Sequence, residues 1–219
     1  MAMDSVEFAS LLCSRLCHDL LSPVGALNNG IELLADEHDP EMRARCLELL
    51  ADSARASANK LKFFRLAFGA AGGFGEQVDS REAKTAIEGL FVSGGRVELG
   101  WMVGDASLSK PASKLLLNLA LIAGDALVRG GRLDVGAETR GEVTEIVVRA
   151  EGDRIVLDPE LRLARLALAF YARLALAAAA AWLAYRLATD NGGSIQVSEP
   201  GEPFLLFGAT IATSCPQPA

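Results

Sequence analysis

The chain has 219 residues, is 51% hydrophobic and carries a formal charge of −7 at neutral pH. This composition favours one or two globular domains with an ample core and argues against intrinsic disorder. Because proteins that bind phosphate backbones need clustered lysine and arginine, the acidic balance argues against nucleic acid as the main partner. The N-terminus lacks the basic and apolar regions of a signal peptide and the four cysteines form no CxxC pair, so we expect a cytoplasmic protein.

Two long helices are expected first in the chain. Apolar residues recur every three or four positions across residues 5–36, which predicts an amphipathic helix with this stripe as its core face. The stripe consists of Leu16, Leu20, Val24, Leu27, Ile31 and Leu34. After a short polar turn, Asp39 is suited to cap a second helix that has Pro40 at its first position and ends near Phe68. Two long helices joined by so short a turn form an antiparallel hairpin.

A hairpin of two helices cannot bury its own apolar stripe. Pairing with a second copy about a two-fold axis would bury it in a four-helix bundle, so the sequence predicts a homodimer. The glycine-rich run at residues 68–76 then ends the second helix and marks a boundary. We therefore divide the chain into a helical hairpin at residues 1–70 and a second domain at residues 78–219.

The second domain alternates helical and strand patterns. Helices are expected near residues 80–93, 111–128 and 160–189, and strands at residues 97–103, 131–138, 142–150, 194–198 and 204–213. This order predicts an α/β two-layer sandwich with helices on one face of a mostly antiparallel sheet, so the fold class of the chain is α+β. The alanine- and leucine-rich run at residues 166–185 is interrupted by Arg173, and alanine inserts weakly into lipid, so we expect a buried helix and no membrane span.

His18 is the residue whose surroundings indicate chemistry. In the first helix it lies about 160° from Leu16 and Leu20, so it should be exposed. A neutral imidazole is a competent nucleophile, and the adjacent Asp19 can orient the ring by accepting a hydrogen bond from one nitrogen while the other attacks. Pro23 suits a local bend. Phosphoryl transfer fits these residues, because in that reaction the protein mainly positions the reacting groups.

Residues 18–23, HDLLSP, resemble the H-box of sensor histidine kinases, in which the histidine is followed by an acid, a leucine, a variable residue, a serine or threonine, and a proline. The resemblance implies that His18 is the phosphoacceptor and Asp19 its acid/base partner. It also implies that Ser22 occupies the serine or threonine position of the motif and that Pro23 kinks the helix. The second domain has the order of elements of the GHKL-type ATPase domain of these kinases.

The residues with which such an ATPase domain holds nucleotide are largely replaced. Asn118 matches the first asparagine of the kinase N-box, but Ile122 stands where the magnesium-binding asparagine should be. Ala150 stands in place of the adenine-reading aspartate, and an alanine-rich run replaces the lid glycines. Gly192 and Gly193 remain, but a turn into a strand explains them. We therefore expect a degenerate domain that binds no ATP and holds no metal of its own.

A zinc site at Cys13, Cys17 and His18 is also not expected. Structural zinc takes four ligands, and His18 points about 100° away from Cys17 on a helix. The two thiols are better interpreted as small core side chains.

Over nearly its whole length the chain is similar to the ChpT-type histidine phosphotransferases of alphaproteobacterial cell-cycle phosphorelays. The similarity lies in residues 16–34, the KLLLNLALIAGDAL helix, the RGGRLDV strand entry and the NGGSIQV ending. It implies a homodimer with a central four-helix bundle and two degenerate ATPase domains. It also implies that His18 accepts a phosphoryl group from the receiver aspartate of a hybrid kinase and passes it to response-regulator receivers, which bring the Mg²⁺.

Two surfaces near His18 are candidates for contact with a receiver. On the first helix, Leu21, Gly25 and Asn29 share the exposed side with Ser22. On the second helix, Arg55, Asn59 and Lys62 are expected to lie roughly level with His18 and to flank a receiver's acidic pocket, although a solvated surface is the alternative for each.

Two other functions are consistent with the same sequence. One is an active ATP-dependent sensor histidine kinase, which nucleotide titration would reveal. The other is a non-catalytic dimeric scaffold, which is indicated if a phosphorylated receiver leaves no acid-labile label on the protein or if His18→Ala accepts label as well as the wild type.

Overall fold

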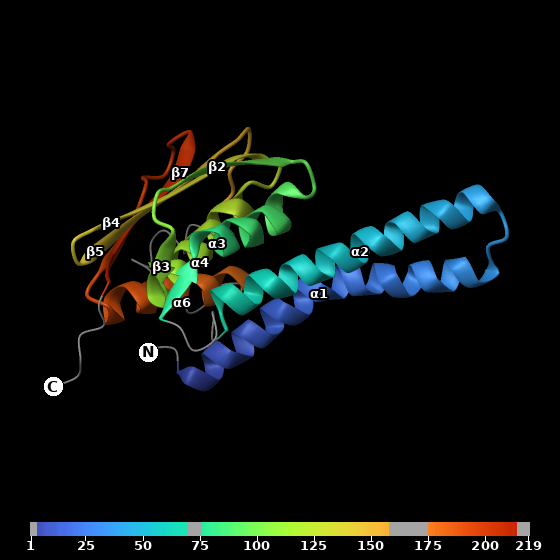
Figure 1. Cartoon of the computed structure of the whole chain (residues 1–219), viewed down its shortest axis with the longest axis horizontal. Coiled ribbons are helices and arrows are strands. Elements are labelled where there is room, and N and C mark those ends of the chain that lie inside the picture. Colours follow the sequence, from blue (N-terminus) through green and yellow to red (C-terminus); the bar gives the residue numbers. More distant parts are fainter. Residues whose placement is uncertain (1–3, 70–75, 158–174, 214–219) are drawn as a thin grey trace.

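The structure is a computed structural model that describes residues 4–69, 76–157 and 175–213. Helix α1 (Ser5–Asp36) and helix α2 (Pro40–Ala67) form the expected antiparallel hairpin. Asp4 caps α1 in a capping box with Glu7, and Asp39 caps α2 by accepting hydrogen bonds from the backbone nitrogens of Glu41 and Met42. Figure 1 shows the far half of the hairpin projecting away from the rest of the chain.

The contact between α1 and α2 differs from the predicted stripe. The buried residues of α1 are Arg15, Pro23 and Gly30. A Cβ atom at Gly30 would lie 2.8 Å from Leu50 Cδ2, so the absence of a side chain there lets the helices approach closely. Val24 and Ile31 of that stripe remain 51% and 60% exposed, in keeping with the expectation that a hairpin of two helices cannot bury its own stripe.

The second part of the chain is the expected layered α/β unit. Its elements are β1 (Gln77–Asp79), α3 (Ser80–Ile87), the π-helix η1 (Glu88–Val92), β2 (Val97–Val103), β3 (Ser107–Ser109), α4 (Lys110–Ala126), β4 (Gly131–Arg140), β5 (Val143–Glu151), α6 (Ala175–Asp190), β6 (Ser194–Val197) and β7 (Phe204–Ala212). The main sheet has the order β2-β4-β5-β7-β6, in which only the β2–β4 pair is parallel. The sandwich with a mostly antiparallel sheet is thus confirmed, and the short antiparallel pair β1–β3 and the π-helix are additions.

Helix α4 is the centre of the molecule. It is buried on nearly every side, because the sheet covers one side, α6 packs along it and the end of α2 packs on another side (Figure 1). Burial alternates along β5, so one sheet face packs on the helices and the other is open. This arrangement brings the last turn of α4 against α1, close to His18.

The alanine- and leucine-rich region is described only from Ala175 onward, where α6 confirms a helix; residues 158–174 lie outside the described part of the chain. Within the described residues, none of the helices has the length and apolarity needed to cross a membrane.

Candidate functional site

The His18 side chain is 67% exposed on α1, as its helical phase predicts. Its Nδ1 atom lies 3.1 Å from Asp19 Oδ1. Because a carboxylate only accepts hydrogen bonds, Nδ1 carries the proton in this contact, and Nε2 is the nitrogen with a free lone pair. This contact leaves Nε2 as the nitrogen through which the imidazole can act as a nucleophile.

Arg15 holds the second carboxylate oxygen of Asp19, Oδ2. Arg15 Nε donates to Asp19 Oδ2 at 2.5 Å, one helical turn before it, and Arg15 Nη2 donates to Asp125 Oδ2 at 2.7 Å. The side chains of Arg15 and Asp19 are only 8% and 16% exposed, so solvent screens their pairing weakly. Burial alone would lower the pKa of Arg15, but Asp125 and Asp19 outweigh it and raise this pKa above its ordinary value. The guanidinium is thus fixed between two carboxylates.

Asp125 is supplied by α4 and belongs to the α/β part of the chain. Its side chain is 39% exposed, and desolvation where it meets α1 raises its pKa while Arg15 opposes the rise. Arg15 thus offsets part of the cost of placing this carboxylate against α1.

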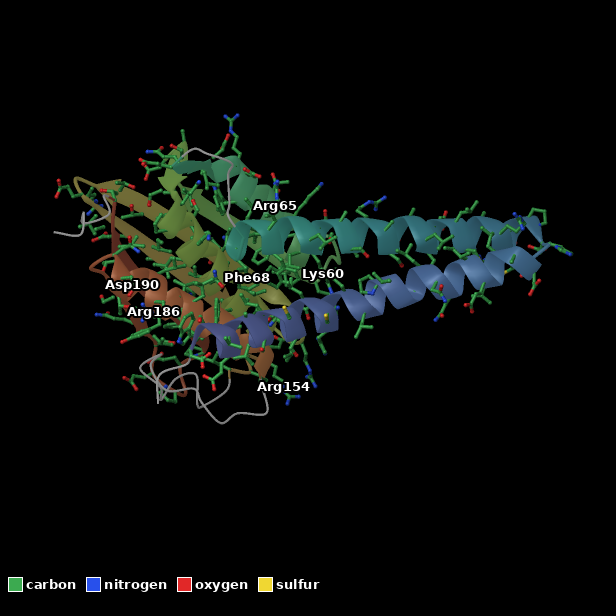
Figure 2. All side chains as sticks on the ribbon, turned by 90° about the horizontal axis from the view of Figure 1, so that it is seen from below. Lys60, Arg65, Phe68, Arg154, Arg186 and Asp190 are labelled. Atoms are coloured by element: carbon green, nitrogen blue, oxygen red, sulfur yellow. The ribbon has the colours of Figure 1, made fainter. Side chains whose placement is uncertain are left out.

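Pro23 acts on Asp19 through the backbone. Proline has no N–H, so the carbonyl of Asp19, four residues earlier, lacks its usual helical donor. Lys60 Nζ of α2 donates to that carbonyl at 2.6 Å. In Figure 2, Lys60 lies in the space between α2 and α1, whereas Arg65 points to the opposite side of α2, where it pairs with Glu82 of α3. Because of this proline, Lys60 of α2 can bind α1 at Asp19, the residue beside His18.

The remaining predicted contact residues of α1 are all on the surface. Leu21 is 70% exposed, and Ser22, Gly25 and Asn29 are exposed as well. A Cβ atom added at Gly25 would meet nothing within 4 Å in the described structure. These four residues give a surface beside His18 that a second protein can approach closely.

The predicted contact residues of α2 lie in different surroundings. Arg55 is exposed and pairs with Asp52 at 3.1 Å. Lys62 is exposed and lines a groove between α2 and α3. Asn59 points inward, because its Nδ2 donates to the carbonyl of Gly89 in the π-helix at 3.1 Å. Asn59 therefore fastens the hairpin to the α/β part of the chain.

The positions that match nucleotide ligands in kinases are used for packing. Asn118 is fully buried, and its Nδ2 donates to the carbonyls of Ala67 and Lys114. Ile122 and Ala150, which stand at the metal and adenine positions, are also buried. None of these three side chains is available to a ligand in this structure.

Gly192 and Gly193 form a turn, as the sequence predicts. Gly192 has φ +68°, which favours glycine, and a Cβ atom at Gly193 would lie 1.8 Å from the carbonyl oxygen of Thr210. They are therefore explained by the entry into β6.

Arg15, Lys60 and Asp125 are site residues that the sequence analysis missed. Arg15 could have been found, since arginine four residues before an acid is a recognisable helical ion pair. Asp125 gave a weaker signal as an acid at the end of an apolar helix, and Lys60 gave none.

Comparison with known proteins finds relatives of this chain among phosphotransferases. The family model described as "Histidine phosphotransferase C-terminal domain" matches residues 80–203. A curated relative, "Protein phosphotransferase ChpT" of Brucella abortus (strain 2308), is 37% identical over 158 residues, which is 72% of this chain and 74% of that protein.

Solved structures extend the likeness to both parts of the chain. A bacterial phosphotransferase solved at 1.7 Å superposes with a TM-score of 0.81 at 31% identity, covering 95% of this chain and 98% of that one. The mycobacterial sensor histidine kinase MprB has a TM-score of 0.50 at 17% identity over 64% of this chain and 99% of that one, a likeness of fold alone. The expected similarity to phosphotransferases is confirmed.

Proposed function

Because this chain belongs to the histidine phosphotransferase family, we propose that it relays phosphoryl groups between receiver domains through His18. His18 accepts the group from the aspartate of one receiver, that of a hybrid kinase, and passes it to the aspartate of a response-regulator receiver. The pairing of an exposed imidazole with a nearly buried carboxylate supports this most directly, because it presents one reactive nitrogen to a partner.

The transfer requires one bond to form and one to break. The lone pair of His18 Nε2 attacks the phosphorus of the aspartyl phosphate, an N–P bond forms, and the P–O bond breaks so that the aspartate leaves as a carboxylate. The ring becomes positively charged as this happens, and Asp19 Oδ1 accepts the hydrogen bond of Nδ1 and offsets that charge. The second transfer reverses these steps on another receiver.

Divalent metal is proposed to come with the receiver, where it neutralises charge on the transferring group. The described residues contain no group of three or more His, Cys, Asp or Glu side chains that could hold a metal ion. In this proposal the chain contributes the nucleophile, its orientation and a surface for docking.

The docking surface is proposed to surround His18 on the hairpin. Leu21 offers an apolar contact beside the ring, and Ser22 and Gly25 allow close approach. Arg55, which pairs with Asp52, and Lys62, in the groove between α2 and α3, are proposed to add positive charge at the edge of this surface for an acidic pocket. Asn59 is left out of this surface because its amide is used within the chain.

The test is transfer of label from receivers to the full chain. A panel of receiver domains is phosphorylated on aspartate with radiolabelled acetyl phosphate, freed of the donor and mixed with the protein. We expect label on the protein that acid removes and base does not, as for an N–P bond, and onward passage to a second receiver. If no receiver gives such label, the proposal is contradicted and the non-catalytic scaffold becomes the supported function.

We propose further that the protein does not use ATP. Asn118, Ile122 and Ala150 are buried in packing, so a nucleotide would have to displace the core to reach them. Calorimetric titration with Mg-ATP should therefore give no heat of binding up to millimolar nucleotide. Saturable binding in the micromolar range, or label on His18 from ATP alone, would instead identify an active kinase.

A second copy of this chain is proposed to cover the exposed apolar side of the hairpin. Val24 and Ile31 repeat seven residues apart on α1, as Met42 and Leu49 do on α2, and all four are between 44% and 60% exposed. A seven-residue repeat gives each helix a continuous apolar edge, which two hairpins can bury against each other. This half of the hairpin also projects beyond the α/β part of the described chain, which leaves room for a copy (Figure 1).

A charge on this edge should separate the dimer. Ile31→Glu places a carboxylate in the proposed interface, where its desolvation would shift the sedimentation equilibrium from dimer to monomer. Leu33→Glu is the matched control: its side chain is equally exposed, at 61%, but lies about 160° around the helix. A monomeric wild-type protein, or equal effects of the two variants, would contradict the proposed interface.

A further inference from the structure

Two ion pairs and a hydrogen bond join the α/β part of the molecule to His18. Asp125 of α4 binds Arg15 of α1, Arg15 binds Asp19, and Asp19 binds the His18 ring, with successive distances of 2.7, 2.5 and 3.1 Å. Asp125 and Asp19 are separated by more than a hundred residues in the sequence, so folding alone brings them to the same guanidinium.

Arg15 is constrained at both ends of its planar head. Its Nε atom and its Nη2 atom donate to different carboxylates, which fixes the plane of the guanidinium more firmly than one partner would. Because only 8% of its side chain is exposed, water cannot readily replace either carboxylate. The orientation of Arg15 therefore depends on Asp125.

Arg15 in turn determines how Asp19 meets the imidazole. The donor from Arg15 occupies Oδ2, so Oδ1 is the oxygen that faces His18 Nδ1. If Arg15 turned away, the carboxylate of Asp19 could rotate, and the ring would lose the contact that keeps its proton on Nδ1. Every rotation of this kind reduces the fraction of protein whose Nε2 is ready to attack.

We infer that Asp125 and Arg15 are positioning residues for phosphoryl transfer, through which the α/β domain holds the Asp19 carboxylate against His18. This inference rests on the proposed function. It gives the α/β domain, in which Asn118, Ile122 and Ala150 are buried, a direct part in the reaction: its central helix carries near its end the carboxylate that orients the site.

Asp125→Asn is the main variant, because it keeps the shape of a partly exposed side chain and removes the charge that attracts Arg15. The transfer rate at saturating receiver should fall roughly tenfold, within the hundredfold that a misplacement of about 1 Å can cost. The receiver concentration at half-maximal rate should stay the same, since Asp125 lies outside the proposed docking surface. Glu41→Gln, which removes an exposed ion pair with Arg45 at the far end of the hairpin, should leave both values unchanged.

Two further variants separate positioning from general damage to the fold. Arg15→Lys keeps the charge but cannot bridge both carboxylates, and it should lower the rate to a similar extent. The double variant Arg15→Gln with Asp125→Asn should be no slower than Arg15→Gln alone, since Asp125 acts through Arg15. If the two substitutions lower the transfer rate multiplicatively in the double variant, the inference is wrong.

The ring of His18 offers a readout that a merely structural role would not move. With only two histidines in the chain, imidazole ¹⁵N spectra can be assigned with His38→Gln. The wild-type protein should show Nδ1 protonated and Nε2 free, and Asp125→Asn should raise the share of the opposite tautomer. The inference fails, and the proposed function stands, if the wild-type protein accepts label while Asp125→Asn transfers at the wild-type rate with an unchanged spectrum. A wild-type protein that accepts no label contradicts the proposed function itself.

Discussion

Replacing His18 with glutamine should abolish phosphoryl acceptance, reducing label transferred from a receiver by more than about three orders of magnitude. A glutamine amide has no lone pair comparable to that of imidazole Nε2, so the N–P bond cannot form. The side chain is 67% exposed, so its removal should leave the fold intact. The measurement is the rate of labelling by a phosphorylated receiver, with circular dichroism to verify the helical content.

His38 provides the control for this experiment. It is the other imidazole of the chain, exposed in the turn between α1 and α2. His38→Gln should be labelled at the wild-type rate, because no surface of the proposed kind surrounds it. Label on His18→Gln, or loss of label in His38→Gln, would show that His18 is not the phosphoacceptor.

The sequence was sufficient to predict the hairpin and the sandwich, because their signals are local or periodic. Asp39 followed by Pro40 predicts the start of α2, and the structure confirms both residues in these roles. Strand alternation predicts all five strands of the main sheet. The three-residue strands β1 and β3 are too short to alternate, which is why they were missed.

The candidate site could be predicted only as far as its residues are close in the sequence. His18 and Asp19 are adjacent, so their pairing follows from the helix. Pro23 frees a carbonyl by a rule that applies to any helix, but that Lys60 binds it depends on how α2 packs on α1. Asp125 required the whole α/β fold to be in place, and no periodicity encodes such a contact.

Burial on α1 is a second case in which sequence periodicity is not sufficient. Helical phase places Val24 and Ile31 on the apolar stripe, yet the close contact with Leu50 of α2 is made at Gly30. Periodicity identifies which residues share a side of a helix, but it does not say whether the partner on that side is the same chain or another. The exposed part of the stripe is therefore the basis for the proposed dimer.

Replacing Asp19 with asparagine should reduce the transfer rate by about 10² to 10⁴, the range attributed to a positioned acid/base group. Both oxygens of the aspartate accept hydrogen bonds, one from Arg15 and one from His18. Asparagine has one acceptor and one donor, and the charged Arg15 will take the acceptor. The amide N–H then faces His18 Nδ1, which must accept, so the proton moves to Nε2 and the attacking lone pair is lost.

This reasoning predicts an unusual order of activities, in which Asp19→Ala retains more transfer than Asp19→Asn. Alanine leaves the ring with no partner, so both tautomers are populated and a fraction keeps Nε2 free, whereas asparagine actively stabilises the wrong tautomer. Single-turnover rates with one phosphorylated receiver, measured beside the ¹⁵N spectrum of His18, test both parts of the prediction. If asparagine transfers faster than alanine, Asp19 acts through its shape or its charge at a distance, and the assignment of the proton to Nδ1 is wrong.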